Sequence, residues 1–69
     1  MKELTPREVE VTEGVANGKS NREIAVTMKV SIHTVRAHMR AILGKTDTYN
    51  RTELAVKVLK GLVKVAGGK

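Results

Sequence analysis

The 69-residue sequence contains no cysteine, tryptophan or phenylalanine, and it has only one tyrosine and one proline. Without cysteine it cannot form disulfides or thiolate metal sites, so stability must come from packing, helix caps or association. The core must be aliphatic, because aromatic residues make up only 1% of the chain. No apolar run approaches the length of a membrane span, and the N-terminus has no signal-peptide core. We therefore expect a cytoplasmic protein without membrane contact.

Basic residues outnumber acidic residues by 13 to 7. The formal net charge is +6 at pH 7, which favours an anionic partner such as nucleic acid. No nucleophile–base pair or phosphate loop is visible, and the glutamates Glu8, Glu23 and Glu53 each fit a helix cap. His33 and His38 are five residues apart and do not share a helix face. We expect no enzymatic activity, no cofactor and no metal.

Helix start signals recur along the chain. An N-cap residue is followed three positions later by glutamate in three places: Thr5 with Glu8, Ser20 with Glu23, and Asn50 with Glu53. Ser31 can cap the helix that begins at residue 32. Gly14 is expected to weaken the first helix by about 1 kcal/mol relative to alanine. The predicted helices are 6–17, 21–28, 32–45 and 51–66. The sequence thus predicts one all-α domain over residues 1–69.

The stretch 32–45 has the most unusual pattern. Its apolar residues fall in one stripe about 100° wide, at Ile32, Val35, Met39, Ile42 and Leu43. The opposite face is mostly small at its centre, with cationic residues on one flank: His33, Ala37, Ala41 and Gly44, then Arg36 and Arg40. Such a face suits close approach to a polyanion, as in the DNA major groove. A surface helix with incidental alanines is the alternative. Because about three residues separate this helix from 21–28, the pair is typical of a helix-turn-helix.

The last predicted helix has an apolar face of about 200°, wider than packing against one small core requires. We expect Leu54, Val58 and Leu62 to face the core. The outer edge, formed by Val56, Leu59 and Val63, is expected to make a weak homodimer interface. A membrane-surface helix is the alternative, but the polar side holds only lysines and the apolar side lacks Trp and Phe.

The ordered motifs resemble the LuxR-type helix-turn-helix domain, also called the GerE or NarL type, a four-helix DNA-binding module of bacterial transcription regulators. The matching pieces are Leu4-Thr5-Pro6-Arg7-Glu8, Asn17-Gly18, Ser20-Asn21-Arg22-Glu23-Ile24-Ala25, Val30-Ser31, Thr34-Val35-Arg36-Ala37-His38, Ile42-Leu43 with Lys45, and Asn50-Arg51-Thr52-Glu53. They run in the family's order and cover nearly all of residues 3–62. Gly44 departs from the pattern and predicts fraying of the third helix, and Lys29 predicts a left-handed lysine in the turn.

The resemblance implies binding to double-stranded DNA, with the third helix in the major groove and a dimer formed through the fourth. The base contacts that it implies are Arg36, Ala37 and Arg40. The backbone contacts that it implies are Ser20, Asn21, Ser31, Thr34, His38 and Lys45. An alternative is a protein-interaction module like region 4 of sigma factors, which would dock on RNA polymerase or a partner regulator. Arg36 and Arg40 favour DNA.

Overall fold

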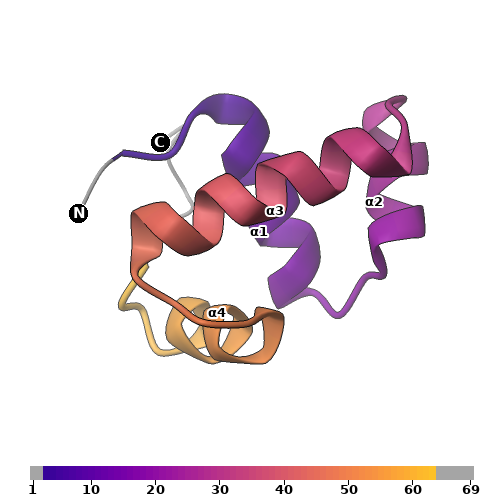
Figure 1. The fold of residues 1–69 in the computed structure, drawn as a ribbon. Coiled ribbons are helices and arrows are strands. Elements are labelled where there is room, and N and C mark those ends of the chain that lie inside the picture. The colour runs from indigo at the N-terminus through magenta and orange to yellow at the C-terminus, as the bar shows by residue number, and fades with distance from the viewer. Residues whose placement is uncertain (1–2, 64–69) are drawn as a thin grey trace.

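The computed structural model describes residues 3–63, and all regular secondary structure within that range is helical. The helices are α1 Pro6–Ala16, α2 Asn21–Met28, α3 Ile32–Thr46 and α4 Arg51–Leu59. Figure 1 shows α3 crossing α1, with α2 beside the start of α3; the chain turns back after α3, and α4 lies below its second half in this view. This architecture confirms the predicted all-α fold.

The predicted caps start every helix. Thr5 with Glu8 and Ser20 with Glu23 form reciprocal capping boxes. The Ser31 hydroxyl accepts the Thr34 N–H at 3.1 Å. At α4 the Asn50 side chain accepts the Glu53 N–H. The Glu53 carboxylate accepts the Tyr49 N–H at 2.6 Å and not the N–H of the cap residue Asn50, so this capping box is incomplete.

The core lies between α1 and the other three helices. α1 packs against α2, α3 and α4, and α3 also packs against α2 and α4. Burial of these aliphatic side chains supplies the main stabilisation. The buried cluster consists of Val11, Val15, Ile24, Ala25, Met28, Val35, Met39, Ile42 and Leu54.

Gly14 is required by the packing of α1 against α2. A β-carbon at this position would lie 2.7 Å from Cγ1 of Ile24, whose side chain is only 2% exposed. Such a distance is too short for two carbon atoms that do not share a bond. The predicted weak point of the first helix is therefore the place where the second helix approaches its backbone.

The turn before α3 and the end of α3 both contain left-handed residues. Lys29 has φ 60° and ψ 43°, so the left-handed lysine predicted in the turn is present. The predicted fraying at Gly44 is wrong, because α3 continues to Thr46 and ends at Asp47, with φ 60°. The Thr46 hydroxyl donates to the carbonyl oxygen of Ile42 at 2.8 Å, so this buried polar side chain is hydrogen-bonded within the last turn.

α4 ends at Leu59, earlier than the predicted residue 66, and residues 64–66 of the prediction lie outside the described part of the chain. Gly61 has φ +76°, and its N–H bonds the carbonyl of Val58 at 3.0 Å. The Leu62 N–H bonds the carbonyl of Lys57 at 2.8 Å. These are the bonds of a Schellman motif, which a left-handed glycine permits.

After Gly61 the burial of two residues is the reverse of the prediction. Val63, predicted at the exposed dimer edge, is only 4% exposed and is buried. Leu62, predicted in the core, is 61% exposed. The helical periodicity that placed them does not extend past Gly61, so both predictions are wrong for this reason.

Candidate nucleic-acid interface

The long helix α3 presents one broad face to solvent. Its inward side chains, Val35, Met39, Ile42 and Thr46, are buried, so the opposite side must be open. No acidic residue occurs anywhere in α3. We call the exposed side the recognition face; it consists of His33, Arg36, Ala37, Arg40, Ala41 and Gly44. The three predicted base contacts, Arg36, Ala37 and Arg40, all lie on it.

Three predicted backbone contacts lie along one half-buried flank of α3: Thr34, His38 and Lys45. Thr34 is tied to the helix cap, since its hydroxyl oxygen lies 3.1 Å from that of Ser31. The structure therefore brings Ser31 and Thr34 together as one pair of hydroxyls at the start of α3. These hydroxyls can donate to or accept from a neighbouring group.

The start of α2 holds the other two predicted backbone contacts. Ser20 is exposed, and its hydroxyl accepts the Glu23 N–H at 3.1 Å. Asn21 is half-buried, and its side-chain oxygen accepts a hydrogen bond from the guanidinium of Arg51 at the start of α4. The same guanidinium donates to the carbonyl of Lys19. Sequence reasoning assigned Arg51 no role in the site.

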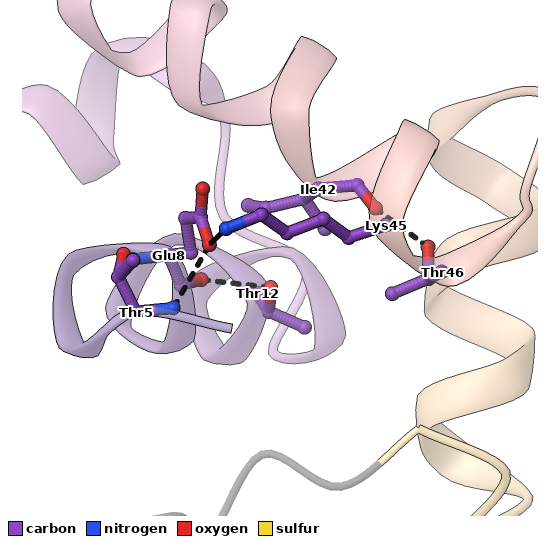
Figure 2. A network of polar contacts seen from close by, with 6 residues as sticks. All are labelled: Thr5, Glu8, Thr12, Ile42, Lys45 and Thr46. Atoms are coloured by element: carbon purple, nitrogen blue, oxygen red, sulfur yellow. Dashed lines mark hydrogen bonds and ion pairs between the residues drawn. The ribbon is translucent and has the colours of Figure 1, made fainter. Parts of the chain in front are cut away.

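Lys45 differs from the other predicted backbone contacts because its charge is already engaged. Figure 2 shows its ammonium pointing to the carboxylate of Glu8. Nζ lies 2.7 Å from Oε1 of Glu8, and the Lys45 side chain is only 24% exposed. The sequence pattern predicts a cation available to phosphate. The structure gives Lys45 an ion pair between the end of α3 and the start of α1, and its contact with DNA phosphate stays a prediction.

Glu8 is a buried carboxylate with two donors on one oxygen. The residue is 5% exposed, and Oε1 accepts both from Lys45 and from the Thr5 N–H, the latter at 2.9 Å (Figure 2). Burial raises the pKa of Glu8, but the hydrogen bond and charge of Lys45, together with the bonds from Thr5, outweigh burial. The pKa of Glu8 therefore lies below its usual value, and the carboxylate is ionised at neutral pH.

Charge is unevenly distributed over the described surface. The exposed carboxylates of Glu3, Glu10 and Glu13 lie on α1 or just before it, whereas Arg36 and Arg40 are exposed on α3. Arg7 is also exposed on α1, Glu23 is exposed on α2 and Asp47 is exposed at the end of α3, so exposed carboxylates are absent from α3 itself but not from its surroundings.

The predicted dimer edge is only partly exposed. Val56 is exposed and Leu59 is 74% exposed, whereas Val63 is buried. Leu62 takes its place on the surface next to the end of α4. The exposed apolar residues at this end are therefore Val56, Leu59 and Leu62, which we call the α4 patch.

The described residues offer neither a metal site nor a membrane-spanning helix. Over residues 3–63, no group of histidine and acidic side chains has the arrangement that holds a metal ion. None of the helices in this same part of the chain combines the length and apolar character needed to cross a bilayer.

Known proteins resemble this chain over most of its length. Uncharacterized transcriptional regulatory protein YhcZ of Bacillus subtilis (strain 168) is 41% identical over 58 residues, covering 84% of this chain and 27% of that protein. Transcriptional regulatory protein LiaR of the same strain is 43% identical over 53 residues, covering 77% and 25%. Response regulator protein VraR of Staphylococcus aureus (strain NCTC 8325 / PS 47) is 40% identical over 53 residues, with the same coverage of 77% and 25%.

The chain spans about a quarter of the length of the curated relatives it matches. No solved structure matches it. Residues 2–58 match the family described as bacterial regulatory proteins, luxR family, and that range takes in α1, α2, α3 and all but the last residue of α4. The chain therefore belongs to the luxR family of bacterial regulatory proteins, and its four helices are the DNA-binding helix-turn-helix of that type.

Proposed function

We propose that this chain binds specific sequences of duplex DNA, with α3 in the major groove, as the DNA-binding part of a bacterial transcription regulator. The observation that carries the proposal is the recognition face. It is exposed, free of acidic residues within α3 and bordered by Arg36 and Arg40. Because such a regulator acts on chromosomal DNA, the proposal includes a cytoplasmic location.

Arg36 and Arg40 are the proposed base-reading residues. They are four residues apart on one helix and both are exposed, so they project from the same flank of α3. Each guanidinium can donate to O6 and N7 of a guanine. Ala37 is small enough to let the helix approach the base pairs and can contact a thymine methyl group.

The proposed phosphate contacts surround the recognition face. They are Ser20 and Asn21 at the start of α2, and Ser31, Thr34 and His38 on α3. At both helix starts the helix dipole also favours an anion. Lys45 is a further proposed phosphate contact, at which the phosphate would share the ammonium with Glu8.

The proposed dimer uses the α4 patch. Val56, Leu59 and Leu62 are exposed, and an isologous contact between two copies would cover them. So small a patch gives a weak interface that two adjacent DNA half-sites would reinforce. The half-sites are then expected about one helical turn apart.

Selection of binding sites from a random duplex library tests the proposal. We expect enrichment of a motif repeated about 10 base pairs apart, and an affinity that falls with salt by a log–log slope of about 0.9 per neutralised phosphate. A pool without enrichment, together with no binding to duplex DNA, would exclude the function. It would favour the alternative, a module that docks on RNA polymerase or on a partner regulator.

A further inference from the structure

We infer that Arg51 is a positioning residue for DNA binding: it orients the Asn21 side-chain amide so that the amide donates to a DNA phosphate. The inference rests on the proposed function, in which Asn21 contacts the backbone. Arg51 itself is not required to touch DNA.

The geometry places one guanidinium across the entry to α2. Arg51 is the first residue of α4, and its Nη1 donates to Oδ1 of Asn21 while its Nη2 donates to the carbonyl of Lys19. These two acceptors lie on either side of Ser20, the N-cap of α2. A single planar side chain therefore fixes both the backbone before the cap and the first side chain after it.

The chemistry of the three groups determines how the amide is turned. A guanidinium can only donate hydrogen bonds, and a phosphate oxygen can only accept them, whereas an asparagine amide has one end of each kind. With Oδ1 of Asn21 bound to Arg51, the NH₂ end is directed away from Arg51. Without that bond the amide can rotate and present its oxygen, which a phosphate repels.

The contact between Arg51 and Asn21 connects the proposed dimer interface with the proposed phosphate contacts. Arg51 begins α4, which carries the α4 patch, and it holds the start of α2, which carries two proposed phosphate contacts. Displacement of α4 would therefore also disturb Asn21. This link joins residues that are 30 positions apart in the sequence.

A double-mutant cycle tests the inference. Arg51→Ala, Asn21→Ala and the double variant are titrated with the selected duplex under conditions where circular dichroism shows each to be folded. We expect each single variant to bind about five- to tenfold more weakly, and the double variant to bind no more weakly than Asn21→Ala. Lys60→Ala removes the same charge at the far end of α4 and is the matched control, expected to change affinity less than twofold.

Two further variants separate orientation from a merely structural role. Asn21→Asp keeps an oxygen for Arg51 but replaces the donor by a second acceptor, so its affinity should fall at least as far as that of Asn21→Ala. Arg51→Lys keeps the charge without the two-pronged geometry and should bind nearly as weakly as Arg51→Ala.

The inference is overturned if the two alanine losses multiply in the double variant, or if Asn21→Asp binds as well as the unmodified chain. Absence of any duplex binding by the unmodified chain would overturn the proposed function and the inference with it. Normal binding by the unmodified chain and by Arg51→Ala would overturn the inference alone.

Discussion

Replacement of Lys45 by methionine removes the ammonium that faces Glu8 while keeping an unbranched side chain between α3 and α1. The buried Glu8 carboxylate then retains the Thr5 N–H but loses its charged partner. A hydrogen bond to a charged group contributes about 1.5–3 kcal/mol. Because the Lys45 side chain is 24% exposed, water screens part of this interaction, and we expect a loss of about 1–2 kcal/mol in the free energy of unfolding.

The loss should depend on pH in a defined direction. The pKa of Glu8 is lowered on folding, so its contribution is present above the unfolded value of about 4.5 and is lost as the pH falls through the lower folded value. Once Glu8 is protonated, the ammonium of Lys45 has no charge to neutralise. The difference between the two chains should therefore be largest near pH 7 and shrink as the pH falls below the unfolded value of about 4.5.

Thermal and urea unfolding measure this difference directly. For a domain of this size the expected loss lowers Tm by about 5–15 °C at neutral pH. Arg7→Met is the matched control, because it breaks an ion pair to Glu10 whose two side chains are 57% and 52% exposed. That control should change stability by less than about 0.5 kcal/mol. A Lys45→Met variant as stable as the control, or equally destabilised at acidic pH, would refute the reasoning.

Three further changes test the packing, the turn and the α4 patch. Gly14→Ala is expected to destabilise the fold by about 1–2 kcal/mol in urea unfolding, since the new methyl group would overlap Ile24; a more stable variant would contradict this close approach. Lys29→Gly is expected to stabilise the fold by about 0.5–1 kcal/mol in the same assay, because glycine adopts φ 60° without strain; an unchanged midpoint would argue against strain in the turn. Leu59→Glu should weaken binding to a paired DNA site more than binding to a single half-site; equal losses would exclude an interface at the α4 patch.

Helix starts could be predicted because their signals are local. The Ser20–Glu23 capping box and the short turn at Lys29 fix the predicted limits of α2, and the structure has the same limits. The end of α4 could not be found from apolar periodicity, which continues beyond Leu59 in the sequence. Gly61 was the available signal, because a glycine just after a helix end commonly takes the left-handed conformation and redirects the chain.

The site could be predicted only as far as one helix face. The exposure of Arg36 and Arg40 follows from the spacing of apolar residues within α3. The partners of Lys45 and Arg51 do not, because each bond to Glu8 or Asn21 joins residues 37 or 30 positions apart. Local patterns identify a cation and its helix but not the buried acceptor that tertiary packing brings to it.

The central claim, that α3 reads DNA sequence, is tested most directly by the base preferences of two arginine variants. Arg36→Ala and Arg40→Ala are each titrated with a complete set of single-base variants of the selected duplex, with Lys60→Ala as the control for lost charge. Each arginine variant should lose about 1–3 kcal/mol of binding free energy and its preference at one base pair per half-site. A uniform loss of affinity with an unchanged preference profile would show that both arginines contact only phosphates and would contradict the account.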